Sequence, residues 1–260
     1  MGSAPIQGRL WGAAAADWSQ LTEPAMTPVY EAVFDAVGVA PDTRLLDAGC
    51  GSGLALQLAH KRGATVSGLD ASAALLAVAQ ERVPEADLRE GDLEALPFQD
   101  DSFDAVTAFN AVQYAADPVA ALRELRRVAA PGAPVAVVTW AEAERCETRV
   151  VLATIGRLLP PPPPGAGGPF ALSAPGRLEE LLAAAGLRPQ RAGEAPAPFL
   201  HPDLDSAVRA HLAAGPARRA LEHAGPQATA DALREALADS RQPDGSYRQD
   251  NAFRYVIATA

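Results

Sequence analysis

The feature that most constrains the fold is a glycine-rich stretch at residues 45–53, Leu-Leu-Asp-Ala-Gly-Cys-Gly-Ser-Gly. An apolar run leads into it from Arg44, and a helix-like run at residues 54–62 follows it. Glycines at a turn between a strand and a helix permit positive φ and let a ligand touch the main chain. The stretch therefore predicts a strand, a ligand-binding turn and a helix, which together open an α/β fold.

Asp47 distinguishes this turn from a dinucleotide site. A dinucleotide site seats a pyrophosphate on the helix N-terminus, where a carboxylate would repel it. The dinucleotide fingerprint also needs a glycine where Leu54 stands. An acid at this point suits a ligand that carries an ammonium group and no phosphate, and S-adenosylmethionine is such a ligand.

Two further acids stand at the ends of predicted strands. Asp70 ends the segment 65–69 and lies 21 residues after Gly49, where the acid at the end of a second strand meets ribose hydroxyls. Asp92 follows the short extended segment 86–89. A single acid at a strand end is usually a helix cap or a solvated turn residue. Three acids in this order predict a nucleoside site.

These motifs resemble those of the class I S-adenosylmethionine-dependent methyltransferases. They most resemble the branch related to the ubiquinone and menaquinone C-methyltransferases and to small-molecule methyltransferases of specialised metabolism. The resemblance is close over residues 40–140 and holds only in outline elsewhere. It implies a Rossmann-like α/β fold, with a seven-stranded, mostly parallel sheet whose last strand is antiparallel, and helices on both faces. The segments that carry the resemblance are 45–53, 68–76, 91–98, 103–118 and 127–139.

Alternating strand and helix patterns agree with that fold and predict a parallel sheet. After Trp140 the alternation stops, and residues 160–164 form a proline run that predicts a stiff connector. Residues 1–27 show no clean helical period. The predicted strands are 44–47, 65–69, 86–89, 103–109, 134–140, 187–195 and 251–259, and the predicted helices are 29–37, 54–62, 72–82, 118–129, 147–159 and 175–185.

The domain organisation follows from these elements and from the resemblance. We expect a single methyltransferase domain over residues 1–260, with a cofactor-binding core at 40–140. Residues 1–30 are predicted to form an N-terminal lid segment. Residues 197–245 have helical spacing and are predicted to form a helical lid insertion before the last strand, as the family pattern implies.

The resemblance, together with motif position, assigns the cofactor S-adenosylmethionine to the carboxyl ends of the strands. It implies that Asp47 balances the ammonium group, that Asp70 binds both ribose hydroxyls, and that Asp92 takes the adenine amino group. The backbone carbonyl of Asn110 is expected near the sulfonium. The predicted cofactor-binding residues are Asp47, Ala48, Gly49, Cys50, Gly51, Gly53, Asp70, Ala71, Leu75, Asp92, Leu93 and Asn110, with Trp18 and Tyr30 closing over the ligand.

Acceptor-binding residues are predicted from their places just beyond the strand ends. Gln113 and Tyr114 follow the fourth strand, and Trp140 and Glu142 follow the fifth. His201 stands at the start of the predicted lid insertion and is a candidate general base toward a hydroxyl, although a loop histidine is more often structural. The predicted catalytic residues are His201 and Tyr114. The predicted substrate-binding residues are Gln113, Tyr114, Trp140, Glu142 and His201.

Composition narrows the partners. The net charge is −10, and the arginines at 123, 126 and 127 fit a solvated helix face, so nucleic acid is a poor partner. Two cysteines form no disulfide framework, and no Cys/His spacing predicts a metal site. No apolar run reaches the roughly 18 residues of a membrane span, and no signal peptide is recognised. We therefore expect a cytoplasmic protein away from membranes. The oligomeric state stays open, with a homodimer among the options.

The sequence thus predicts an S-adenosylmethionine-dependent methyltransferase that acts on a small organic acceptor. One alternative is an enzyme that uses the cofactor without methyl transfer, for a cyclisation or a decarboxylation. Others are an NAD-dependent oxidoreductase, which explains Asp47 and Asp92 poorly, and a non-catalytic regulatory or scaffold subunit. The resembled family methylates carbon, oxygen and nitrogen with different residues, so the resemblance transfers no general base.

Overall fold

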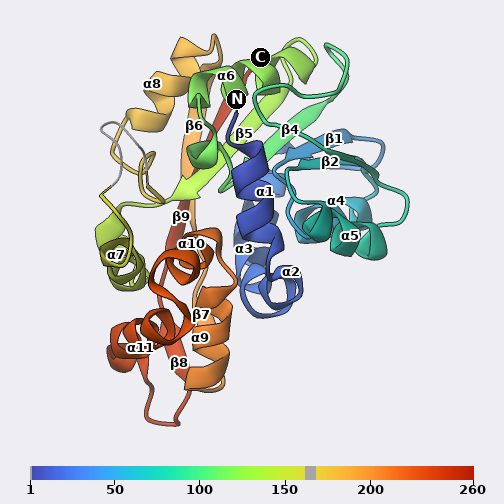
Figure 1. Ribbon diagram of the computed structural model, residues 1–260. Coiled ribbons are helices and arrows are strands. Elements are labelled where there is room, and N and C mark those ends of the chain that lie inside the picture. Colours follow the sequence, from blue (N-terminus) through green and yellow to red (C-terminus); the bar gives the residue numbers. More distant parts are fainter. Residues whose placement is uncertain (1, 162–167) are drawn as a thin grey trace.

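The computed structural model describes residues 2–161 and 168–260 (Figure 1). A seven-stranded sheet forms its centre, in the order β3-β2-β1-β4-β5-β9-β6. The predicted connector at 160–164 falls partly on residues 162–167, which lie outside the described residues. The strands of this sheet are β1 Arg44–Ala48, β2 Thr65–Asp70, β3 Asp87–Glu90, β4 Ala105–Phe109, β5 Pro134–Trp140, β6 Arg188–Pro196 and β9 Ala252–Thr259.

The strand directions match the predicted fold class. Strands β1 to β5 pair in parallel, and the final strand β9 lies between β5 and β6 and is antiparallel to both. Parallel neighbours need a crossover between them, and helices supply it. The seven-stranded, mostly parallel sheet with an antiparallel last strand is therefore confirmed.

The crossover helices begin where the sequence provides caps. Ser72 accepts a hydrogen bond from the Leu75 N–H at 3.2 Å and starts α5, as its predicted N-cap role requires. Asp117 caps α6, with Pro118 in the first turn. The helices around the sheet are α3 Thr27–Val37, α4 Leu54–Lys61, α5 Ala73–Arg82, α6 Pro118–Val128, α7 Arg149–Arg157 and α8 Arg177–Ala184.

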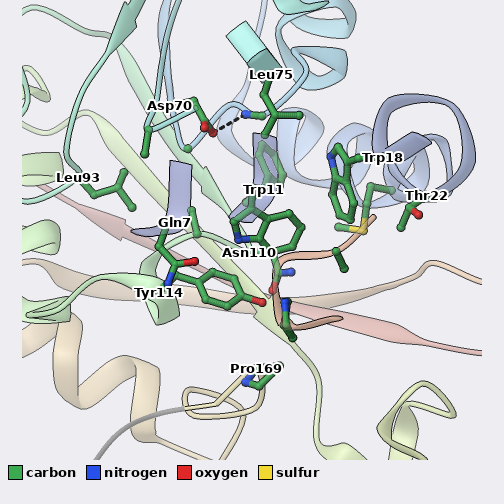
Figure 2. Close-up of a pocket in the computed structure, with 18 of the residues that line it drawn as sticks. Gln7, Trp11, Trp18, Thr22, Asp70, Leu75, Leu93, Asn110, Tyr114 and Pro169 are labelled. Carbon is green, nitrogen blue, oxygen red and sulfur yellow. Dashed lines mark hydrogen bonds between the residues drawn. The ribbon is translucent and has the colours of Figure 1, made fainter. Parts of the chain in front are cut away.

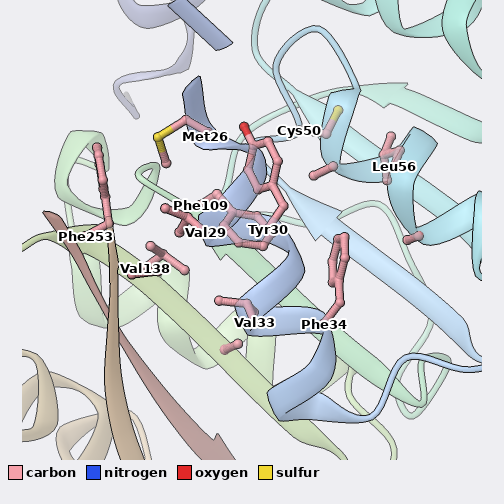
Figure 3. Packing of buried hydrophobic residues seen from close by; sticks show 14 of the residues in the cluster. Met26, Val29, Tyr30, Val33, Phe34, Cys50, Leu56, Phe109, Val138 and Phe253 are labelled. Atoms are coloured by element: carbon pink, nitrogen blue, oxygen red, sulfur yellow. The ribbon is translucent and has the colours of Figure 1, made fainter. Parts of the chain in front are cut away.

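Apolar side chains bury both faces of the sheet. On one face Val33 and Phe34 of α3 join Leu56 of α4 and pack with Phe109 and Val138 from the strands (Figure 3). Full burial of one side chain of this kind stabilises the fold by about 1.5–3 kcal/mol. This layer fixes the positions of the loops that leave β1 and β4.

Helices α6 and α8 cover the opposite face. Leu122 and Leu125 of α6, with Leu178 and Leu182 of α8, pack in one cluster with the strands and are fully buried. Their spacing of three and four residues places each pair on one side of its helix. The sheet is therefore a buried middle layer, and its strand ends are left for ligands.

The N-terminal residues differ from the expectation of an aperiodic segment. Ala4–Gly12 forms helix α1, followed by the short α2, Ala15–Asp17, and a π-helical turn, Trp18–Thr22. Close packing holds α1: a Cβ added at Gly8 would lie 2.0 Å from the carbonyl oxygen of Ala71. Tertiary contacts thus form a helix that local periodicity does not predict.

Residues 197–249 form a cluster of helices with a small sheet, seen below the main sheet in Figure 1, and so include the predicted insertion 197–245. The helices are α9 Leu204–Leu212, α10 Gly215–Ala224 and α11 Pro226–Ala236. The helical content agrees with the prediction. A two-stranded antiparallel sheet of β7 Phe199–His201 and β8 Tyr247–Gln249 was not predicted, and it places His201 on a strand instead of in a loop. Strands of three residues are too short to show an alternating pattern.

The helical cluster has a hydrophobic core of its own. Val208, Leu233 and Leu237 from the cluster pack with Val151 and Ile155 of α7. Leu152 of α7 also packs against the core of the main sheet, so α7 contacts both the insertion and the sheet core. In the part of the chain that the structure describes, no helix combines the length and the apolar character needed to cross a membrane.

Candidate functional site

A cavity lies at the carboxyl ends of the parallel strands, where the topology predicts a ligand site (Figure 2). Each of the loops after β1 to β4, and the end of β5, contributes to it. From these positions the cavity is lined by Gly49, Gly51, Asp70, Ala71, Gly91, Asp92, Leu93, Asn110, Ala111, Tyr114 and Trp140.

The glycine loop is held tightly against its neighbours. The N–H groups of Gly49 and Cys50 both donate to the carbonyl of Leu69, at 2.7 and 2.9 Å. Gly49 has a φ of 84°, and a Cβ there would lie 2.5 Å from the Cβ of Ala111. Gly51 also has positive φ, and the site of its missing Cβ has no neighbour closer than 3.9 Å. A side chain at Gly51 would occupy cavity space that a ligand can use.

Asp70 organises the end of β2. Its two carboxylate oxygens accept hydrogen bonds from the N–H groups of Gly51 and Ser72, both at 2.9 Å. Burial raises the pKa of Asp70, and these backbone donors oppose the increase. Each carboxylate oxygen keeps a lone pair for a further donor. This orientation fits a ligand with two neighbouring hydroxyl groups, such as a ribose.

Asp92 and three apolar residues continue the site. Asp92 accepts from the Glu94 N–H at 3.0 Å, and Leu93 lines the cavity beside it. Ala71 and Leu75 supply further apolar lining. A carboxylate next to an apolar wall suits a flat heterocycle with an amino group, as in adenine.

Asp47 lies behind the glycine loop and does not line the cavity. It is 1% exposed, and it accepts a hydrogen bond from the Thr107 hydroxyl at 2.8 Å. Its pKa is raised to about 7, chiefly by burial and also by the nearby Asp70 and Glu23, while the hydrogen bond from Thr107 lowers it. A positive group bound close to Asp47 would favour its ionised form.

Glu23 occupies the position that a phosphate would need. Its carboxylate lies 3.4 Å from the N–H of Leu54, the first residue of α4. It is buried and pairs with Arg82, which also donates to the carbonyls of Ser19 and Ser52 at 2.9 Å. A helix N-terminus after a glycine loop binds pyrophosphate in dinucleotide enzymes. Here a resident carboxylate occupies it, which argues against the NAD-dependent alternative.

Helix α1 covers the cavity. Its lining residues Ser3, Ala4, Gln7 and Trp11 share one face of the helix. The Trp11 ring packs edge-on against Trp18 and Tyr114, with centroids 4.9 and 5.6 Å away (Figure 2). On another face of α1, Arg9 pairs with Glu222 of α10. The N-terminal segment is thus held between the core and the helical cluster.

Asn110 and Tyr114 border the middle of the cavity. Asn110 adopts a φ of 51°, which is uncommon for a residue other than glycine, and its side-chain oxygen accepts from the Gln113 amide. Burial raises the pKa of Tyr114, so its phenol stays protonated at neutral pH. It can donate a hydrogen bond but is not suited to act as a base.

The lining residues that come from α3, α7, the helical cluster and the ends of β4, β5 and β9 are mainly apolar, and their aromatic rings pack against one another. The centroids of Tyr30 and Phe109 lie 4.7 Å apart, and those of Trp140 and Phe253 lie 4.3 Å apart. We call this part the acceptor half and the part around Asp70 and Asp92 the cofactor half. The acceptor half is lined by Met26, Tyr30, Phe109, Trp140, Thr148, Leu152, Pro169, Phe199, His211, Pro216 and Phe253.

Most predicted site residues meet in this cavity, and some do not. His201 is buried on β7, its Nε2 has no partner in the described part of the chain, and burial lowers its pKa. Glu142 is exposed, Gln113 is buried against Asn110, and Gly53 packs on Ala79 of α5. The proposed roles of these residues stay predictions. The predicted residues outside the lining are Asp47, Ala48, Cys50, Gly53, Gln113, Glu142 and His201.

Sequence reasoning missed several lining residues, chiefly Gln7, Thr148, Phe199, His211 and Phe253. They come from parts of the chain with no local motif. The helical period of the insertion assigns His211 to a helix without showing which way that helix faces. An available signal was the pair of polar residues just before the last strand: the Gln249 side chain contacts the His211 ring, and the Asn251 side chain accepts from the backbone N–H of Thr148.

Three comparisons with known proteins bear on this site. Residues 46–137 match a family described as a methyltransferase domain. A demethylmenaquinone methyltransferase from Renibacterium salmoninarum is 40% identical over 108 residues, which are 42% of this chain and 46% of that protein. The chain spans about half the length of the curated relatives it matches.

Solved structures share the fold. The structure of the cyclase SpnF aligns with a TM-score of 0.57 and 22% identity, over 89% of this chain and 80% of that one. Geranyl diphosphate C-methyltransferase from Streptomyces coelicolor A3(2), in complex with S-adenosylhomocysteine, aligns with a TM-score of 0.54 and 18% identity, over 90% and 78%. At these identities the likeness shows the fold alone.

The sheet order and the glycine loop are those of the class I methyltransferase fold. Residues 46–137 form a methyltransferase domain, and the family match supports S-adenosylmethionine as its cofactor. The residues present fit that cofactor, because the glycine loop, Asp70 and Asp92 offer acceptors for hydroxyl and amino groups. No arginine or lysine is among the described residues that line the cavity, so none of these side chains could form an ion pair with a phosphate group.

Proposed function

We propose that the chain transfers a methyl group from S-adenosylmethionine to a small organic acceptor in specialised metabolism. The main support for this proposal is that a single cavity contains both the acids at the strand ends and the apolar walls. Asp70 and Asp92 line the same cavity as Trp140, Phe199 and Phe253 of the acceptor half. A half suited to a nucleoside therefore opens onto a space with apolar walls, where an acceptor has room beside the cofactor.

The bound cofactor supplies a methyl group on a positively charged sulfur, so the chemical activation is its own. The chain binds the cofactor and the acceptor, orients them toward each other and excludes water. We assign the ribose hydroxyls to Asp70, the adenine to Asp92 and Leu93, and the ammonium group to Asp47. We assign the main-chain carbonyl of Asn110 to the region of the sulfonium; the left-handed conformation of Asn110 and its place in the cavity lining support this assignment.

We also propose that two segments of a single domain act as lids. Residues 1–30 cover the cofactor half through α1, and residues 197–245 cover the acceptor half through α9 and α10. The pairing of Arg9 with Glu222 joins the two segments. Such a cover excludes water during transfer. We further propose that the protein works in the cytoplasm on a small molecule, without a nucleic-acid or membrane partner.

Mass spectrometry of reactions with S-adenosylmethionine and a library of small acceptors tests this function. We expect a product heavier by one methylene unit and an equal amount of released S-adenosylhomocysteine. The alternative, a cyclisation or decarboxylation assisted by the cofactor, predicts converted substrate without either signal. Conversion of that kind would overturn the proposed methyl transfer while leaving the cofactor site intact.

A further inference from the structure

The acceptor half contains a buried hydroxyl group without a hydrogen-bond partner among residues 2–161 and 168–260. It belongs to Thr148, which lines the cavity and is 2% exposed. Thr148 precedes α7 at the N-cap position, where a threonine hydroxyl usually accepts a hydrogen bond from the helix. Here it makes no such bond. A buried hydroxyl without a partner is costly, so a ligand group that pairs with it gains affinity.

His211 brings a second polar group to the same cavity. Its Nε2 lies 2.7 Å from the side-chain oxygen of Gln249. Because that oxygen can only accept, Nε2 carries the hydrogen and Nδ1 keeps a free lone pair. Burial lowers the pKa of His211 to about 4, so the ring is neutral at physiological pH. Nδ1 is therefore a hydrogen-bond acceptor.

One short segment positions both groups. Gln249 binds His211, and the side-chain oxygen of Asn251 accepts from the Thr148 N–H at 3.1 Å. The Asn251 amide donates to the carbonyl of Gln249 at 3.2 Å, which closes the network. All four residues are buried. The network holds a donor hydroxyl and an acceptor nitrogen among apolar walls.

The charges around the cavity disfavour an anion. Asp70 and Asp92 line it. Two more carboxylates lie nearby: Asp70 and Glu23 both raise the pKa of Asp47, and Glu23 also raises that of Asp70. Its described lining contains no arginine and no lysine. A carboxylate or phosphate in the acceptor half would find no cationic side chain among the described lining residues, and the charged side chains of the cofactor half are carboxylates that would repel it.

We propose, building on the proposed function, that the acceptor is an uncharged, mainly apolar molecule with a hydroxyl group, such as a phenol, bound by His211 and Thr148. The hydroxyl hydrogen is donated to Nδ1 of His211, and the hydroxyl oxygen accepts from Oγ1 of Thr148. The aromatic rings of the acceptor half contact the apolar body of the molecule. Anionic acceptors of the same size are rejected.

Calorimetry with three matched probes tests this class. The probes are 4-propylphenol, 4-propylanisole, in which the hydroxyl hydrogen is replaced, and 4-propylbenzoate, which is anionic. Each is titrated into the full chain saturated with S-adenosylhomocysteine, near neutral pH. We expect the phenol to bind at least about tenfold more tightly than either of the other two, because only it can satisfy both polar groups without adding charge.

Two variants sharpen the test. Thr148→Val keeps the shape and removes the unpaired hydroxyl, so the fold is retained and the affinity for the phenol falls by about three- to tenfold. Thr139→Val is the matched control, because Thr139 on β5 also has a buried, unpaired hydroxyl but does not line the cavity. It should leave the affinity for the phenol unchanged.

Equal or tighter binding of the benzoate overturns the proposal. So does an unchanged phenol affinity in Thr148→Val, or the absence of binding by all three probes at millimolar concentration. Binding of S-adenosylhomocysteine is measured in the same samples. If it binds while the probes do not discriminate, the acceptor class is wrong and the proposed function stands. If it fails to bind, the proposed function itself is wrong.

Discussion

The two halves of the cavity differ in how the chain builds them. The acids and glycines of the cofactor half come from loops at the ends of neighbouring parallel strands, and its polar groups already have partners. Asp70, for example, accepts two hydrogen bonds from backbone N–H groups. The acceptor half is assembled from distant segments between Met26 and Phe253, and it leaves the Thr148 hydroxyl unpaired. The cofactor half is thus ordered by hydrogen bonds within the protein. In the acceptor half we expect the ligand itself to supply a missing hydrogen-bond partner.

Breaking the anchor of the N-terminal segment should have the largest effect. Glu23→Ala removes the partner of Arg82 and the carboxylate at the start of α4. Removal of one partner from a buried ion pair costs about 3–5 kcal/mol, and each kcal/mol lowers Tm by about 2–4 °C in a chain of this size. Thermal denaturation followed by circular dichroism measures the shift.

Glu222→Ala is the matched control for this anchor. It also removes an ion pair of the N-terminal segment, with Arg9, but both side chains are about half exposed. Exposed pairs contribute about 0–1 kcal/mol, so Tm should change little. If Glu23→Ala lowered Tm no more than Glu222→Ala, the segment would not depend on the buried anchor.

Asp70→Ala tests whether the cofactor half is the nucleoside site. Each lost charge-assisted hydrogen bond costs about 1.5–3 kcal/mol, so the affinity for S-adenosylmethionine should fall by at least about tenfold. Calorimetry measures it, and Asp70→Asn keeps one acceptor oxygen and should lose less. Glu85→Ala, an exposed acid before β3, is the control. Unchanged affinity in Asp70→Ala would remove the ribose assignment.

Gly49→Ala in the glycine loop and Gly156→Ala in α7 compare a tightly packed turn with a helix that has space for a side chain. The new Cβ at residue 49 would lie 2.5 Å from that of Ala111, at a φ of 84°. The left-handed conformation alone costs about 1–2 kcal/mol for alanine, so Tm should fall. Gly156→Ala in α7 meets no atom within 4 Å and should raise stability by roughly 0.5–1 kcal/mol. Opposite signs in the two melting curves are expected, and equal shifts would contradict the tight loop.

The pH dependence of cofactor binding gives the smallest expected effect. The pKa of Asp47 is raised to about 7, so in the free protein the carboxyl gains a proton as the pH falls below that value. The ammonium group of the cofactor favours the ionised form, so binding releases a proton and weakens below about pH 7, by at most tenfold per pH unit. Titrations from about pH 5.5 to 7.5 measure the slope.

Asp47→Asn keeps the hydrogen bond to Thr107 and cannot titrate. It should bind more weakly near neutral pH and lose the slope. A wild-type affinity that does not change over this range would show that Asp47 does not sense the ammonium group.

The parallel sheet and the cofactor half could be predicted from the sequence because their signals are local. Gly49 and Gly51 mark a turn, and Asp70 and Asp92 end strands whose carboxyl ends must meet at one edge. The order of the strands along the chain was therefore enough to predict that these residues lie close together. The predicted cap at Ser72 follows from the same local chemistry.

The acceptor half could not be predicted because its geometry depends on packing between distant segments. The sequence predicts His201 in a loop at the start of the lid insertion, whereas the structure buries it on β7, and His211 of α9 lines the cavity. Helix α1 was missed because it depends on close contact with Ala71, not on its own periodicity. In such a region, the direction in which a side chain points and the extent of its burial depend on tertiary packing.

The most direct test of the account is a calorimetric titration of the wild-type protein with S-adenosylhomocysteine. We predict saturable binding with one ligand per chain, and clearly weaker binding to Asp70→Ala. Absence of binding at millimolar ligand concentration by a folded protein would contradict the assignment of the cavity, and with it the proposed methyl transfer.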